Sequence, residues 1–162
     1  MQILKDIPVS SPPASAPAKD VVNDGFFPDI SLASMREAMR LDATVTDARL
    51  RPAIIAAMAS TNQLLAGWQQ AQRAAGWNTL AAVPAVQLDG ESLNLALYRR
   101  AVYSFAKADL FEGHRDIDTT ASSLTDRKSM DWMDLAPEVQ RRNAHWAVND
   151  ILGRPHATVE LI

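Results

Sequence analysis

Few side chains in this sequence are of the types that carry out catalysis or hold metal ions. There is no cysteine, and the histidines are far apart in the sequence, at His114, His145 and His156. The run His114–Asp118 holds one histidine and two aspartates, but a zinc site needs three or four convergent ligands at a recognised spacing. His145 closely follows Arg141 and Arg142, which indicates a basic surface rather than an acid–base centre. We therefore expect no metal and no cofactor.

Motifs of nucleotide binding and nucleophilic catalysis are also missing from the sequence. It has no glycine-rich phosphate loop and no Gly-x-Ser-x-Gly turn. Neither arginine doublet can form a basic patch by itself, because adjacent helical positions diverge by about 100°. These doublets are Arg99-Arg100 and Arg141-Arg142. We expect neither an enzyme nor sequence-specific binding of nucleic acid.

Length and composition predict a single globular domain. The chain has 162 residues, 48% of them hydrophobic, and its 16 basic and 19 acidic side chains give a net charge of −3. That length supports one hydrophobic core and is too short for two ordinary domains. No apolar run approaches the ~20 residues that cross a bilayer, and the first residues lack the pattern of a signal peptide, so we expect no membrane association. A chain without cysteine suits a reducing cytoplasm.

The elements that must position the remaining side chains are helices. Apolar residues recur at helical spacing over residues 31–41, 47–75, 89–112 and 137–152. Asp89 is expected to cap the third helix, whose two neighbouring apolar stripes place it at the centre of a bundle. Pro52 indicates that regular helix in the second segment begins later or bends. Residues 114–129 are expected to form a polar loop, followed by a short helix at 130–135. The predicted fold class is all-α, a small helical bundle.

Both ends of the chain predict extended segments outside the helical domain, which is expected to span residues 26–153. Residues 1–25 contain four prolines and should form an extended, Pro-rich tail. Residues 154–162 should form a strand-like C-terminal arm, in which apolar and polar residues alternate after the stop at Gly153 and Pro155. A lone strand leaves backbone donors and acceptors open, so the alternatives are addition to a sheet of another molecule and a frayed tail.

Two aromatic residues and two arginines stand near the start of the bundle. Phe26 and Phe27 precede Pro28 and have too much apolar surface to remain in water, so they fill either the chain's own core or a neighbouring subunit. Arg36 and Arg40 lie one turn apart on the first expected helix. These arginines are either solvated or part of a contact with another subunit.

A series of short motifs follows in one order along the chain. They are Phe26-Phe27-Pro28-Asp29-Ile30, Arg36, Arg40-Leu41, Ala48-Arg49-Leu50-Arg51, Ala75-Gly76, Leu80-Ala81, Val83-Pro84-Ala85, Asp89-Gly90-Glu91-Ser92, Arg100-Ala101-Val102 and Trp146-Ala147-Val148. In this order, over residues 26–162, the sequence resembles the head completion proteins of peduovirus-type contractile-tailed phages. Residues 119–136 depart from that pattern.

The resemblance implies a head–tail adaptor of the virion, which binds the portal protein after DNA packaging, closes and stabilises the filled head, and supports a downstream neck protein and the tail. It implies a homo-oligomeric ring of twelve copies, assembled in the host cytoplasm, with double-stranded DNA passing through the lumen. The inter-subunit candidates are Phe26, Phe27, Arg36 and Arg40. Related adaptors send a terminal arm into the portal, so the portal-docking candidates are Ala157, Val159, Leu161 and Ile162.

Two other classes of protein remain as alternatives. A small helical regulatory or binding module without ring assembly would stay a compact monomer at any concentration of portal. An enzyme subunit would carry a polar pocket of convergent titratable groups, which the sequence does not indicate.

Overall fold

The computed structural model describes residues 19–118 and 137–156 of the chain. In these ranges the chain forms helices, one turn of 3₁₀-helix and a two-strand antiparallel hairpin. In chain order the elements are α1 (Leu32–Met39), α2 (Asp47–Ala74), η1 (Leu80–Ala82), β1 (Gln87–Leu88), β2 (Glu91–Ser92), α3 (Leu93–Asp118) and α4 (Pro137–Leu152). The fold is therefore mostly helical, as predicted, but it is not purely all-α, because a short hairpin precedes α3.

Capping residues set the ends of α1 and α2. The Ser31 hydroxyl accepts a hydrogen bond from the Ser34 amide at the start of α1. Gly76, with φ at +95°, follows the end of α2, where glycine suits the left-handed conformation. Pro52 lies inside α2, which already begins at Asp47. Of the two alternatives for this proline, the later start is wrong, because one missing backbone bond near a helix end is outweighed by burial of the residues around it. The other alternative, a bend in the first turns, stays a prediction.

Asp89 and Gly90 form the turn of a β-hairpin and not a helix cap. The register places Gln87 opposite Ser92 and Leu88 opposite Glu91. Both turn residues have positive φ, +50° for Asp89 and +76° for Gly90, as a type I′ turn requires. The prediction that Asp89 caps the third helix is therefore wrong, and α3 begins four residues later, at Leu93.

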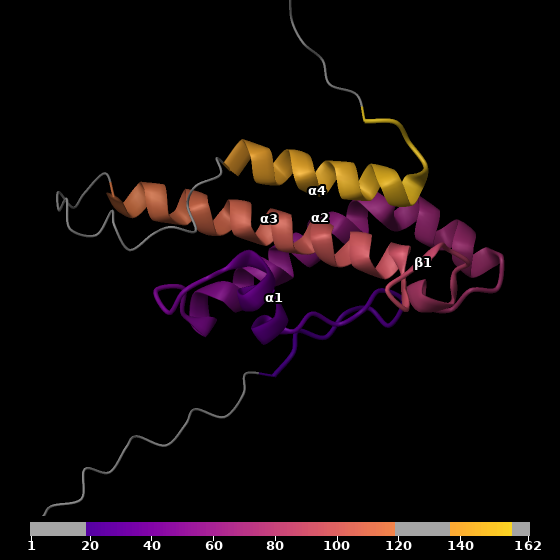
Figure 1. Cartoon of the computed structure of the whole chain (residues 1–162), viewed down its shortest axis with the longest axis horizontal. Coiled ribbons are helices and arrows are strands. Elements are labelled where there is room, and N and C mark those ends of the chain that lie inside the picture. Colours follow the sequence, from indigo (N-terminus) through magenta and orange to yellow (C-terminus); the bar gives the residue numbers. More distant parts are fainter. Residues whose placement is uncertain (1–18, 119–136, 157–162) are drawn as a thin grey trace, which may run out of the picture.

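Helix α3 lies at the centre of the bundle, as its two apolar stripes predict. It contacts α1, α2 and α4, and Figure 1 shows α4 running alongside it. Tyr98, Val102 and Phe111 are among its buried side chains, each at most 2% exposed. The helix continues to Asp118, beyond its expected end near Gly113.

Helix α4 has the predicted limits. It begins at Pro137, where proline fits the first turn, and Gly153, with φ at +66°, follows its last residue. Its inner face is apolar and buried at Ala144, Ala147, Val148 and Ile151. The short helix expected at 130–135 and the strand expected from Ala157 lie outside the described residues.

Residues 19–30 pack along the bundle before α1 begins. Val21 and Ile30 form an antiparallel bridge with two backbone hydrogen bonds of 2.8 and 3.0 Å. Both side chains are buried in the common core. The packed body therefore includes Val21, a residue of the range 1–25 predicted as a tail.

A closed ring of hydrogen bonds ties this N-terminal segment to two helices. Asn23 Nδ2 donates to the Tyr98 hydroxyl at 2.8 Å, and that hydroxyl donates to Asn62 Oδ1 at 2.6 Å. Asn62 Nδ2 then donates to Asn23 Oδ1 at 2.9 Å. Burial is the main cause that raises the pKa of Tyr98 far above its usual range. The phenol therefore keeps the proton that this ring of bonds needs.

The central position of α3 makes a mutational prediction. Val102→Asp should abolish soluble folding, because its unpaired charge would be buried at a site that is 0% exposed. The milder Val102→Ala should fold with a loss of about 1.5–3 kcal/mol. Soluble yield and thermal melting by circular dichroism measure both effects.

The matched control for this prediction is Arg100→Asp, on the same helix at an exposed position. This control should keep wild-type solubility and melt within a few degrees of wild type. A soluble Val102→Asp protein with unchanged melting would show that α3 is not the centre of the core.

Candidate assembly surfaces

The predicted aromatic anchor is built into the chain's own core. Phe26 and Phe27 are only 2% and 3% exposed. Phe27 stacks on Tyr98 of α3 with ring centroids 4.7 Å apart, and Phe26 meets Trp68 of α2 edge-on at 6.3 Å. Both rings therefore fill the chain's own core, which was one of the two alternatives. Neither ring is available to a neighbouring subunit.

Asp24 holds the turn that inserts these two rings. Its Oδ1 accepts hydrogen bonds from the amides of Phe26 and Phe27, both at 3.0 Å, and its Oδ2 accepts one from Gln69 Nε2 of α2 at 2.7 Å. Partial burial would raise the pKa of the Asp24 carboxyl, but these hydrogen bonds and the nearby Arg73 together lower it. The charged carboxylate is thus favoured and fastens the segment to α2.

Arg36 and Arg40, predicted on one contact surface, have different surroundings. The Arg36 guanidinium donates to the Asp42 carbonyl at 3.3 Å and pairs with the Asp47 carboxylate, so it joins the end of α1 to the first turn of α2. Arg40 follows α1 in the left-handed conformation, with φ at +54°, and is exposed. Arg36 therefore has an internal structural role, whereas Arg40 presents its charge outward.

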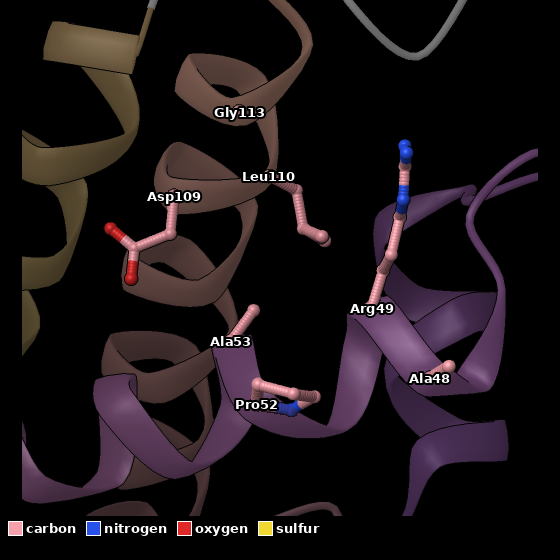
Figure 2. Close-up of a pocket in the computed structure, with 7 residues that line it drawn as sticks. All are labelled: Ala48, Arg49, Pro52, Ala53, Asp109, Leu110 and Gly113. Carbon is pink, nitrogen blue, oxygen red and sulfur yellow. The ribbon is translucent and has the colours of Figure 1, made fainter.

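A hollow of about 420 Å³ lies between the first turns of α2 and the second half of α3 (Figure 2). It is lined by Ala48, Arg49, Pro52, Ala53, Asp109, Leu110 and Gly113. Most of this lining is apolar. The two charged side chains, Arg49 and Asp109, come from different helices and point to different sides in Figure 2. The lining suits contact with apolar groups and has no nucleophile or paired acid and base.

Charges at the junction of α3 and α4 are paired. Arg141 forms a two-pronged hydrogen bond with Glu112, with NH2 to Oε2 at 2.7 Å, and lies 3.7 Å from Asp109 Oδ1. Burial raises the pKa of Asp109 although Arg141 opposes that rise. The hydrogen bond with Glu112 is the main cause that raises the pKa of Arg141. The basic surface predicted around His145 is thus partly neutralised by the acids of α3.

His145 and His156 both make aromatic contacts. His145 meets Phe105 edge-on at 5.2 Å, and His156 stacks on Trp146 at 4.9 Å. Among the side chains that the structure describes, those of residues 19–113 and 137–156, no group of three histidine or acidic residues could hold a metal ion. The side chains of the run His114–Asp118 lie outside this description. In residues 19–118 and 137–156, no helix is long and apolar enough to cross a membrane.

Several large apolar side chains are exposed, and the periodicity of the sequence did not single them out. They are Val22, Ile55, Leu64, Trp77, Val86 and Leu88. Val22 lies in the N-terminal segment, and Val86 and Leu88 lie next to or in the hairpin. Ile55 and Leu64 are on α2, and Trp77 follows the end of that helix. The Asp-Gly pair between the two short strands was the sequence signal that could have located the hairpin.

Comparison with known proteins gives the same family as the order of motifs. The sequence model of the family described as "Phage head completion protein (GPL)" matches residues 21–162. The "Head completion/stabilization protein" of Escherichia phage P2 is 43% identical over 142 residues, which covers 88% of this chain and 82% of the relative. No solved structure matches the chain significantly. The resemblance found in the short motifs is therefore confirmed, and this chain belongs to the phage head completion protein family.

Proposed function

We propose that this protein is a structural component of a phage virion that completes and stabilises the DNA-filled head and provides the platform for neck and tail attachment. The observation that carries this proposal is the family match over residues 21–162, together with the 43% identity to a head completion/stabilization protein. The closely packed helical body, with an N-terminal segment fastened along it, suits a protein that works by contact.

The proposed partners are the portal protein above and a downstream neck protein below. The adaptor would assemble in the host cytoplasm into a homo-oligomeric ring, with twelve copies matching the portal, and double-stranded DNA would pass through its lumen. A net charge of −3 suits a conduit that must not hold DNA tightly. Ring closure by rotation requires two different faces on each subunit.

Arg40 is the best-supported residue for one of these faces. Phe26 and Phe27 are buried inside the chain, and Arg36 is engaged with Asp42 and Asp47. Arg40 is exposed directly after α1 and is free of the structural role that Arg36 has in joining two helices. A charge at this position can steer subunit contact without being needed for the fold of one subunit.

The C-terminal arm is the proposed contact with the portal. Ala157, Val159 and Leu161 alternate with polar residues, which is the pattern of a strand that adds to an exposed sheet edge. Main-chain hydrogen bonds would supply affinity. Val159 and Leu161 would enter pockets on one face and fix the register, because a shift by one residue would turn every side chain to the other face. Ile162, whose side chain follows on the opposite face, would fill a separate pocket.

The arm proposal predicts a marked difference between two neighbouring substitutions. Val159→Ser should weaken binding to the portal of the same phage by roughly tenfold to a hundredfold, because a buried apolar contact is lost. The matched variant Glu160→Ser should bind within about threefold of wild type, since this side chain would face outward. A chain ending at His156, which retains all described residues, should not bind. Co-sedimentation with purified portal measures all three.

Equal loss of binding by Val159→Ser and Glu160→Ser would reject the strand register. Full binding by the chain that ends at His156 would reject the arm as the portal contact.

The ring proposal predicts an effect of Arg40 on assembly. Arg40→Glu should reduce head–tail joining by roughly tenfold, because the reversed charge recurs at every subunit contact. Its helicity should stay that of wild type. Arg100→Glu, an equally large charge change at an exposed position of α3, is the control. The assay is infectious titre after the protein is added to filled heads that lack it. Equal titres with the two variants would show that Arg40 is not part of the interface between subunits.

A further inference from the structure

Helix α4 carries an arginine, a tryptophan and an aspartate along one face. Arg142, Trp146 and Asp150 follow one another at intervals of four residues, and such positions share a helix face. The Arg142 guanidinium lies over the Trp146 indole, 4.7 Å from the ring centroid, which is a cation–π contact. This stripe of three residues therefore has the Trp146 indole under the Arg142 guanidinium, and the Asp150 carboxylate lies one turn further along α4.

The chain turns back onto this stripe directly after α4. Gly153 has φ at +66°, and the Arg154 amide donates at 2.8 Å to a carbonyl of the last turn. Figure 1 shows the residues that follow running back over the end of α4. The His156 imidazole then lies nearly parallel to the Trp146 indole, with centroids 4.9 Å apart and planes at 2°.

A hydrogen bond to α4 adds a second restraint on the His156 ring. Its Nε2 lies 2.8 Å from Asp150 Oδ1, and because a carboxylate only accepts, the imidazole is the donor. The aromatic stack fixes the plane of the ring, and the hydrogen bond fixes its rotation within that plane. Together they hold a residue that lies four positions beyond the last residue of α4.

We propose that His156, held by Trp146 and Asp150, is a positioning residue that fixes where the C-terminal arm leaves the body. The inference rests on the proposed function, in which residues from Ala157 onward dock on the portal. Ala157 directly follows His156 in the chain. With His156 held, the arm starts beside α4 and at the same place in every copy of a ring.

The advantage of this arrangement is that the backbone of residues 154–156 is already ordered before the protein binds the portal. Fixing the backbone of one residue disfavours an equilibrium by about fivefold to thirtyfold. If residues 154–156 were not held on α4, portal binding would have to order them as well as the arm. Release of His156 should therefore weaken portal binding by about fivefold to thirtyfold for each residue freed, without removing any contact to the portal.

The test uses the full chain with His156→Ala, and with His156→Phe as the variant that keeps the aromatic stack and loses the hydrogen bond. His156→Ala should weaken portal binding by about fivefold to thirtyfold or more, and His156→Phe should recover most of that loss. The control is His145→Ala, a change of another histidine, which lies on α4 and packs edge-on against Phe105. It should bind as wild type does.

A second measurement checks the stack in the free protein without portal. In NMR spectra, the ring protons of His156 should be shifted upfield by the Trp146 indole, and Trp146→Leu should return them to the position of an unstacked histidine. Unchanged His156 signals in Trp146→Leu would overturn the proposal.

The portal assay separates this inference from the arm proposal. If the chain ending at His156 loses binding while His156→Ala binds as wild type does, the arm is right and the positioning role is wrong. If the chain ending at His156 binds fully, the arm proposal fails and the role of His156 falls with it.

Discussion

The burial of α3 on several sides is the constraint on which the other parts of the structure depend. A helix with two neighbouring apolar stripes cannot be covered by one partner. Helix α2 and the N-terminal segment reach it through Asn62 and Phe27, which both contact Tyr98. Helix α1 reaches it through the Met39 carbonyl, which accepts from Lys107 Nζ at 3.1 Å. Helix α4 packs along the remaining side.

Because of this constraint, we propose that the contacts with other subunits and with the portal lie at the ends of the chain and on exposed loops. The buried apolar stripes of the helices pack against one another inside one subunit, and the Phe26-Phe27 pair is buried there as well. The N-terminal segment is fastened by Asp24 and Asn23, and the chain after α4 is fastened through His156. A body held in this way presents its outward charges in a fixed geometry, which suits the ring that we propose.

Local patterns in the sequence predicted the helices well, because periodicity and caps such as Ser31, Gly76 and Gly153 are encoded by neighbouring residues. The same patterns failed at Asp89-Gly90, since an Asp-Gly pair serves a helix start and a type I′ turn alike. The Asn23–Asn62–Tyr98 ring and the contacts of His156 could not be predicted, because they join residues without a shared period. The order of motifs identified the family but could not place the rings of Phe26 and Phe27.

We propose that this family member works as a ring beneath the portal, and electron cryomicroscopy of the purified protein mixed with portal is the decisive experiment. The ring proposal predicts class averages in which a twelvefold ring of added density lies against one end of the portal. Each subunit of that ring should fit the helical body described for residues 19–118 and 137–156. Portal particles without added density, beside a protein that stays a compact monomer at every portal concentration, would contradict it.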